Sequence, residues 1–464
     1  MSQITHPRDT VSGQTTPDNT GPNDAQLQEL VHNILTEARA QGASATEAGV
    51  SIETGLSVNV RLGEVETLEY NRDKGLSVTV YFGHRQGSAS TSDFTLEAVR
   101  ETVRAACGIA KYTAADEYSG LADAQLMARD IPDLDLCHPW DINAEQAIEL
   151  ASECEGTARS LDSRITNSEG ASVSSHQGYR VYGNSHGFIG AYPSTRHSLS
   201  CAVIASSKNG EGEGMQRDYW FSVARNSAEL DTAAEVGRRA AERTLRRLNG
   251  RRLSTCQSPV IFSAEIATGL LSHFISAIRG GALYRKATFL LDHLGKPVFP
   301  DFVRIHEVPH IKKGLGSAPF DSEGVATTAR DIVCGGVLQG YVLDSYAARK
   351  LGMQTTGNAG GVHNLMIDPG KLDLNGLVKR MNRGLLVTEL MGMGVNTVTG
   401  DYSRGAAGFW VENGEIQYPV EEITIAGNLR NIFMRIAEVG NDIEKRGSVR
   451  TGSILVEEMM IAGE

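Results

Sequence analysis

The chain lacks any long apolar segment. No apolar run reaches the roughly 18 residues that a membrane-spanning helix requires, and residues 1–24 do not show the charged-then-apolar order of a signal peptide. We therefore expect a cytoplasmic protein that neither crosses nor binds a membrane.

Positive charge is also scarce. The 44 Lys and Arg residues are outnumbered by 56 Asp and Glu residues, which gives a formal net charge of -12. Phosphate backbones repel an acidic chain, and no block of Lys and Arg with interleaved aromatic residues supplies a local basic patch. Direct binding to nucleic acid is therefore not expected.

The few cysteines carry no recognisable chemistry. Six cysteines are scattered along the chain without CxxC pairing, so we expect reduced thiols that mostly fill the core. No Ser lies in a GxSxG motif, and no Cys has a recognisable His partner motif. A nucleophilic hydrolase therefore has no support.

Glycine, by contrast, is abundant, with 50 of 464 residues against a usual share of about 7%. The length suggests about three domains, and 41% hydrophobic residues provide sizeable cores. We predict an α+β protein with two helix-plus-antiparallel-sheet units and a glycine-rich, β-rich C-terminal domain. The predicted divisions are a disordered tail 1–24, an N-terminal domain 25–120, a central domain 121–251 and a C-terminal domain 252–464.

The spacing of apolar residues predicts the individual elements. Helices are expected from residue 24 to a stop at Gly42 and over 96–112, 144–161, 229–248, 264–278, 346–352 and 429–439. Three strands are expected over 50–53, 56–62 and 76–82, the first two separated by a glycine and the last two by a turn at 71–75. Further strands are expected between residues 165 and 224 and over 260–262. The rest of 314–414 favours strand and loop. The many Arg and Glu residues of the 229–248 helix are typical of a solvated face.

One segment, His306-Glu307-Val308-Pro309-His310, spells the HExxH motif of zinc proteases. That motif needs both histidines on one helix face, whereas Pro309 inside a helix would cost about 3 kcal/mol. Apolar neighbours such as Phe302 and Ile311 favour an extended segment. We therefore predict two surface or loop histidines and no metal site here.

The glycine-rich segment 355–364 leaves two interpretations open. It lacks the Lys of a P-loop and does not form GxGxxG, so nucleotide binding is not expected. Its small side chains either let an extended peptide lie close to the backbone, with Asn358, His363 and Asn364 as binding candidates, or they form a sharp structural turn.

Two further loops place polar groups beside glycines. Asp321 and Glu323 lie in one, and Asp401 and Arg404 in the other. They could line a polar cleft, and we include Asp401 and Arg404 among the peptide-binding candidates. Ordinary turn chemistry, in which Asp and Ser bind local amides, is the alternative.

Several longer sequence segments identify a protein family far more specifically than these short motifs do. They are LYRKATFLLD at 283–292, VLDSYAARKLG at 342–352, TTGNAGGVHN at 355–364, TGDYSRGAAGFWVEN at 399–413 and VGNDIE at 439–444. With these segments the chain resembles the TldD/PmbA family. The resemblance is dense over 264–464 and looser but collinear over 25–250.

The resemblance implies a cytoplasmic heterodimer that cleaves small or unfolded peptides. In that family the TldD-type subunit carries zinc on a His-Glu-x-x-x-His helix, helped by a C-terminal cysteine. Here the similar helix keeps Glu265, but Ala264 and Gly269 stand at the histidine positions and the last cysteine is Cys334. The resemblance therefore implies no catalytic residue, metal ligand or cofactor in this chain, and zinc in the TldD-type partner.

Three hypotheses follow. The first is a partner subunit that shapes the substrate channel and supports the zinc-bearing subunit. The second is a metallopeptidase active on its own, with metal at His306 and His310 or at an unpredicted site. The third is a regulatory binding protein without proteolytic activity.

Overall fold

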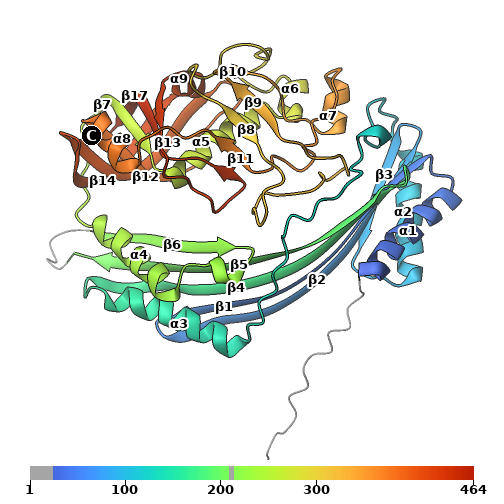
Figure 1. Ribbon diagram of the computed structural model, residues 1–464, viewed down its shortest axis with the longest axis horizontal. Helices are drawn as coiled ribbons and strands as arrows, with labels where there is room; N and C mark the ends of the chain where they lie inside the picture. The colour runs from blue at the N-terminus through green and yellow to red at the C-terminus, as the bar shows by residue number, and fades with distance from the viewer. Residues whose placement is uncertain (1–23, 208–213, 464) are drawn as a thin grey trace, which may run out of the picture.

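The computed structural model describes residues 24–207 and 214–463. It has two parts, a long curved sheet with helices on its outer side and a C-terminal body that lies over the inner side (Figure 1). The predicted disordered tail, residues 1–24, lies outside the described residues except for Asp24, the first residue of helix α1.

The long sheet is antiparallel, with strand order β3-β2-β1-β4-β5-β6. Its strands are β1 Ala45–Arg61, β2 Glu64–Phe82, β3 Arg85–Thr91, β4 Ile165–Asn184, β5 Ile189–Ser206 and β6 Met215–Ala224. Strands of the two predicted N-terminal units join in this one sheet, because β1 pairs with β4 from Glu47↔Asn184 to Val60↔Ala171.

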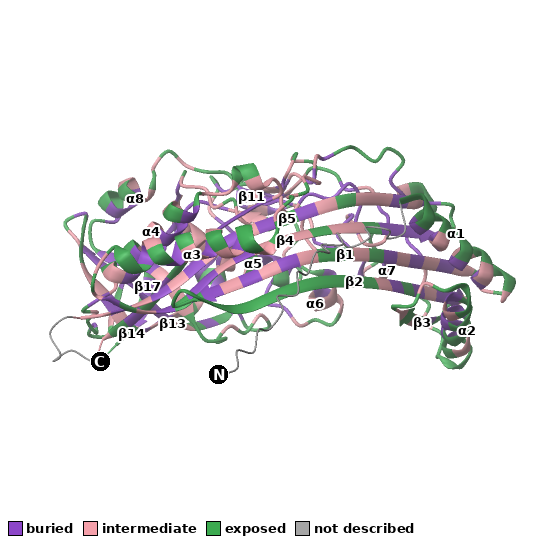
Figure 2. Cartoon of the chain, turned by 90° about the horizontal axis from the view of Figure 1, so that it is seen from below, coloured by how far each residue is buried: buried purple, intermediate pink, exposed green. Residues whose placement is uncertain are grey.

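The strands are longer than predicted. The expected breaks at Gly55 and at residues 71–75 were wrong, since both stretches lie inside the β1–β2 ladder. Local turn propensity is overridden here because β1 is paired on both sides, so its backbone N–H and C=O groups are satisfied only in extended form. Strand β3 pairs only with residues 76–82 of β2, so residues 64–74 of β2 form the edge of the sheet and are exposed (Figure 2).

Two helix pairs cover the ends of the outer face (Figure 1). They are α1 Asp24–Ala40 with α2 Leu96–Tyr112, and α3 Ala144–Ser160 with α4 Ala233–Arg246. Each pair packs on its own apolar core. The first three helices begin where the apolar spacing predicts, and buried Leu27, Val31, Ile34 and Ala38 form the stripe of α1. Single 3-10 turns occur at η1 Ala124–Leu126 and η2 Ser227–Glu229.

The C-terminal body contains two mixed sheets. The larger has the order β14-β13-β12-β7-β17-β15 and the smaller β10-β9-β8-β11-β16. The larger comprises β7 Cys256–Phe262, β12 Gly384–Met391, β13 Asp401–Glu412, β14 Glu415–Asn428, β15 Ile436–Val439 and β17 Ile454–Ala462. The smaller comprises β8 Ile305–Glu307, β9 Arg330–Cys334, β10 Val337–Leu338, β11 Leu365–Ile367 and β16 Val449–Arg450.

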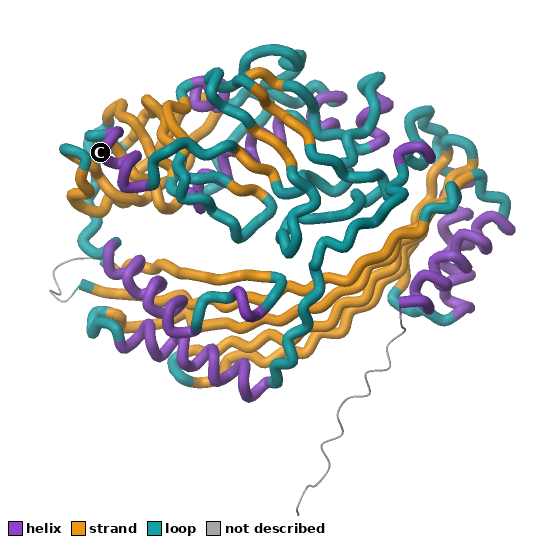
Figure 3. Tube along the Cα trace, viewed as in Figure 1, coloured by secondary structure: helices purple, strands orange, loops and turns teal. Residues whose placement is uncertain are grey.

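The helices of this body are α5 Ala264–Ala277, α6 Gly280–Tyr284, α7 Ser345–Lys350, α8 Leu374–Met381 and α9 Leu429–Met434. The predictions of α5 and α7 are confirmed. The predicted helix 429–439 was wrong beyond Met434, because Ile436–Val439 pairs with β17 as a strand, and α8 was missed inside the segment expected to be strand and loop. Loops make up much of the body (Figure 3), and Gly357 and Gly360 there have φ of 70° and 101°.

The prediction of a mixed α+β protein is confirmed. None of the described helices is long and apolar enough to cross a membrane.

Candidate functional site

The HExxH segment does not form a helix. His306 and Glu307 lie in the short strand β8, as the sequence predicted for an extended segment. His306 faces Asp368 at 3.4 Å, whereas exposed His310 shares a 3.0 Å hydrogen bond with the hydroxyl of Thr327. Burial lowers the pKa of both imidazoles. The two histidines thus make separate contacts and do not share a helix face.

The glutamate of this segment organises a buried network. Glu307 is 2% exposed and accepts hydrogen bonds from Arg330 Nε at 2.9 Å, Asn358 Nδ2 at 2.9 Å and the backbone N–H of His363 at 2.7 Å. Arg330 also donates to Asn358 Oδ1 at 2.8 Å. Asn358 and His363 therefore hold the glycine-rich loop against β8 and β9.

Asn364, the third peptide-binding candidate on this loop, is also hydrogen-bonded within the protein. Asn364 is fully buried, with a φ of 45°. Its amide donates to Val308 O at 3.0 Å and Ser317 Oγ at 2.7 Å. It also accepts from the N–H of Gly316 at 3.1 Å. These bonds give Asn364 a structural role, and peptide binding by the loop stays a prediction.

Asp401 and Arg404 lie elsewhere, on β13. Asp401 accepts from Thr399 Oγ1 at 2.6 Å, and Arg404 Nε donates to Met391 O at 3.1 Å. Among the described residues no contact joins this pair to Asn358, His363 or Asn364. The structure therefore divides the predicted candidates between two places.

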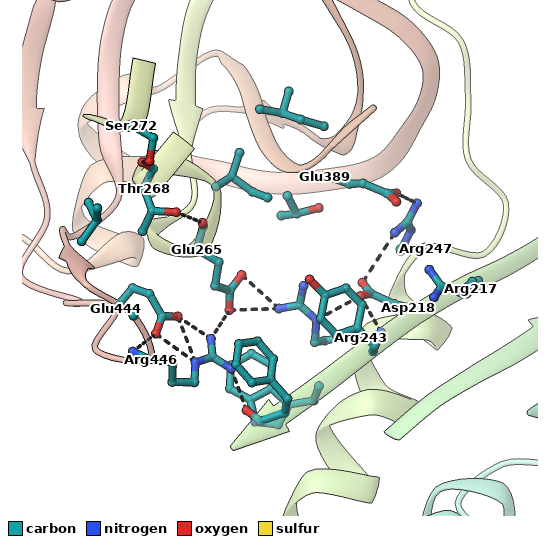
Figure 4. Close-up of a pocket in the computed structure, with 18 of the residues that line it drawn as sticks. Arg217, Asp218, Arg243, Arg247, Glu265, Thr268, Ser272, Glu389, Glu444 and Arg446 are labelled. Atoms are coloured by element: carbon teal, nitrogen blue, oxygen red, sulfur yellow. Dashed lines mark hydrogen bonds and ion pairs between the residues drawn. The ribbon is translucent and has the colours of Figure 1, made fainter. Parts of the chain in front are cut away.

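A cavity of about 460 Å³ opens where the long sheet meets the C-terminal body. It is lined by residues 217–221 of β6, the end of α4, the first turns of α5, residues 388–390 of β12, Glu444 and residues 446–449 (Figure 4). Its size is typical of ligand sites. One wall carries charges, while Ile266, Thr268, Ser272 and Leu390 give the other wall apolar and hydroxyl groups.

The charged wall is an alternating chain of carboxylates and guanidinium groups (Figure 4). In order, it runs Glu389, Arg247, Asp218, Arg243, Glu265, Arg446 and Glu444. The N···O separations are 3.6 Å for Arg247–Asp218, 3.3 Å for Arg243–Asp218, 3.2 Å for Arg243–Glu265 and 3.3 Å for Arg446–Glu265. Every charge in the chain thus has an opposite neighbour.

Two links of this chain cross between the sheet and the C-terminal body. Arg247 and Arg243, at the end of α4, reach Glu389 of β12 and Glu265 of α5. Burial works against the charge of Arg243, yet Glu265 and Asp218 raise its pKa above the ordinary value. Burial alone would raise the pKa of Glu444, but hydrogen bonds from Arg446 bring it below the ordinary value.

Trp220 of β6 completes the site. The guanidinium of Arg446 lies 4.0 Å from its ring centroid, with Arg239 at 5.1 Å and Arg243 at 5.3 Å. Such cation–π contacts orient guanidinium groups on an aromatic face. The ring therefore helps to set the positions of two arginines that pair with Glu265.

The sequence did not point to this site. The solvated face predicted for the 229–248 helix is present at Arg238 and Glu242, which are 42% and 48% exposed, but the prediction was wrong for Arg247, which is 14% exposed and faces the cavity. Arg243 and Arg247, four residues apart, share a helix face. Only the fold shows that this face meets the C-terminal body.

The donor set around α5 does not fit a zinc ion. Ala264 and Gly269 have no ligating side chain, and both oxygens of Glu265 already accept from guanidinium groups. Among residues 24–207 and 214–463, no cluster of three or more His, Cys, Asp or Glu side chains could hold a metal. The chemistry of this site is charge pairing and hydrogen bonding.

Comparison with known proteins covers most of the chain. The domain models of the PmbA/TldA metallopeptidases match residues 46–110 (domain 1), 137–248 (central domain) and 255–463 (C-terminal domain). Metalloprotease PmbA of Escherichia coli is 53% identical over 94% of this chain and 96% of its own length. A PmbA homologue of Haemophilus influenzae is 50% identical over 94% of this chain and 96% of its own, and a TldD homologue of the same organism is 24% identical over 82% of each chain.

Solved structures agree. A proposed modulator of DNA gyrase from Bacteroides thetaiotaomicron superposes with a TM-score of 0.90 at 30% identity, covering 95% of this chain and 100% of its own. TldE from Thermococcus kodakarensis shares the fold, with a TM-score of 0.82 at 21% identity over 94% of this chain and 100% of its own. The matched domains and the identity over nearly the whole length show that the chain belongs to the PmbA/TldD metallopeptidase family.

Proposed function

We propose that this chain is the non-catalytic subunit of a zinc metalloprotease complex that degrades or processes small or unfolded peptides. It pairs with a TldD-type subunit that carries the zinc, and together they form the substrate channel. The complex works in the cytoplasm, as the family resemblance implies. This chain binds no zinc of its own.

The pairing around Glu265 carries the proposal. In a zinc peptidase the helix glutamate must be free to take a proton from metal-bound water. Here Arg243 and Arg446 hold the carboxylate from two sides, at 3.2 Å and 3.3 Å. Both oxygens of Glu265 accept from guanidinium groups, so neither is left free to take a proton from water. The residue thus serves to tie α5 to the sheet.

The comparison proteins support the pairing with a TldD-type subunit. Haemophilus influenzae holds both a PmbA homologue and a TldD homologue similar to this chain. The cavity supports a channel role, because main-chain amides and small side chains of an unfolded peptide suit a wall of hydroxyl and apolar groups facing compensated charges.

The test is to purify the chain alone and after co-expression with the TldD-type subunit of the same organism. Bound zinc and hydrolysis of an unfolded polypeptide would be measured for both preparations. We expect a stable heterodimer, with zinc and activity only when the partner is present.

Two variants separate the rival hypotheses. Stoichiometric zinc in the chain alone, lost in a variant with His306→Ala and His310→Ala, would overturn the proposal in favour of a peptidase active alone. A heterodimer without peptidase activity would favour a regulatory binding protein. Glu265→Gln in this chain should leave the shape of the pH profile of kcat in the complex unchanged, since the proposal gives the residue no role as a base.

A further inference from the structure

The cavity is bounded by an open sheet edge. Strand β6 is the last strand of the long sheet, so alternate residues turn their N–H and C=O groups away from β5. The carbonyl of Phe221 is one such group, because Arg446 donates to it at 2.8 Å. The N–H of Phe221 and both groups of Tyr219, two residues away, must face the same side.

Two side chains of this protein already form hydrogen bonds with outward-facing main-chain groups of β6. Asp218 Oδ1 accepts from the N–H of Tyr219 at 2.7 Å, and Arg446 takes the carbonyl of Phe221. No described residue outside the β5–β6 ladder bonds to the N–H of Phe221 or the C=O of Tyr219. The edge therefore keeps a free donor and a free acceptor next to the cavity.

Arg446 takes the place that a strand added to this edge would need. Besides Phe221 O, its guanidinium reaches Glu265 at 3.3 Å and lies 4.0 Å from the centroid of Trp220 and 4.3 Å from that of Phe221. It belongs to residues 440–448, which connect β15 to β16 without helix or strand. One side chain thus closes the space between β6 and α5.

We propose that Arg446 is an internal competitor for an extended polypeptide that binds as an added strand to the edge of β6. Residues 445–447, which lie between the hydrogen bonds of Glu444 N to Thr451 O and of Leu365 N to Ser448 O, form a strap that holds the groove closed, and a peptide enters when this strap lifts. The ligand class rests on the proposed function, whereas the closed groove is a property of this chain alone.

The charge arrangement permits the strap to lift. Glu444 and Arg446 sit on the same loop and are joined at 2.9 Å through Arg446 Nε, so they can leave together as a neutral pair. Glu265 then keeps Arg243 as its counter-ion at 3.2 Å. Opening therefore leaves no buried charge without a partner. An unpaired buried charge is the usual large cost of breaking an ion-pair network. Glu444 acts here as a positioning residue for Arg446.

Peptide binding to the isolated chain tests the proposal. The probe is a fluorescent, acetylated and amidated hexapeptide of alternating Val and Thr, and its Kd is measured by anisotropy. We expect Arg446→Ala to bind at least tenfold more tightly than the unaltered chain. The matched control is Arg435→Ala, which removes an exposed arginine paired with Glu458 at 2.7 Å and should leave the Kd unchanged.

A second change distinguishes edge binding from a simple enlargement of the cavity. Phe221→Pro removes the outward N–H, which an end strand tolerates, and in the Arg446→Ala background it should abolish the gain. If Arg446→Ala fails to fold, as judged by circular dichroism, the neutral-pair variant Glu444→Ala with Arg446→Ala replaces it. Unchanged or weaker binding in the folded variant, or a gain that survives Phe221→Pro, would overturn the proposal.

The two proposals fail separately. Loss of zinc-dependent activity in the complex would leave the peptide affinity of the isolated chain unaffected. An unchanged Kd in Arg446→Ala would leave the heterodimer and its zinc intact.

Discussion

Replacing Arg330 by Met should destabilise the C-terminal body by about 3–5 kcal/mol. Glu307 is 2% exposed, and Arg330 is its charged partner, at 2.9 Å. Without the guanidinium, Asn358 and the His363 amide still donate to the carboxylate, but its charge stays buried. Breaking a buried ion pair by removing one partner typically costs about 3–5 kcal/mol for this reason.

The assay is urea unfolding at pH 7, followed by circular dichroism and by tryptophan fluorescence. The control is Arg435→Met, because the Arg435–Glu458 pair is 48% and 46% exposed and exposed pairs contribute about 0–1 kcal/mol. A double variant with Glu307→Gln and Arg330→Met should lose less than the sum of the single variants, since each removes the same interaction.

A loss below about 1 kcal/mol in Arg330→Met, similar to the control, would refute the reasoning. It would mean that water or a rearranged loop compensates Glu307. The same assay bears on Asn358, which donates to Glu307 and accepts from Arg330. Asn358→Ala should lose about 1–3 kcal/mol of stability, even in the absence of peptide.

Three further outcomes are expected. Glu155→Ala should cost about 2–3 kcal/mol in unfolding free energy, because this 1% exposed carboxylate accepts two backbone N–H groups of the β1–β2 turn. Burial raises the pKa of Glu323 to about 7, so the folded state holds its proton more tightly than the unfolded state. The protonated Glu323 side chain therefore contributes its full share to the free energy of unfolding below about pH 4.5, and this share is lost as the pH rises to about 7. Glu323→Gln, which can still accept from Ser345, should flatten this part of the stability profile, and an unchanged slope between pH 5 and 8 would contradict the assignment. Gly408→Ala should destabilise the β12–β13 pairing by more than about 2 kcal/mol, since an added methyl would overlap the carbonyl of Leu386; a thermal midpoint equal to that of the unaltered chain would count against it.

Local signals in the sequence predicted several elements well. The apolar stripes of α1, α2, α3 and α5 repeat at helical spacing, and these helices start within a residue of the predicted positions. Pro309 correctly excluded a helix for the HExxH segment, because a proline affects the backbone regardless of what surrounds it.

Elements that depend on distant partners were predicted poorly. Residues 71–75 look like a turn but extend β2, because β1 pairs along their whole length. Ile436–Val439 looks helical, yet β17 supplies the hydrogen bonds of a strand. Propensity is a weak prior that tertiary pairing overrides.

The fold class, the family resemblance and the lack of histidine at positions 264 and 269 of α5 follow from the sequence, because each of these is written in contiguous residues. Only the tertiary structure decided which charges meet. Asp218, Arg243, Glu265 and Arg446 lie on four separate segments, and their pairing requires the long sheet to lie against the C-terminal body. Coulomb interactions depend on distance in space, and chain folding alone sets that distance.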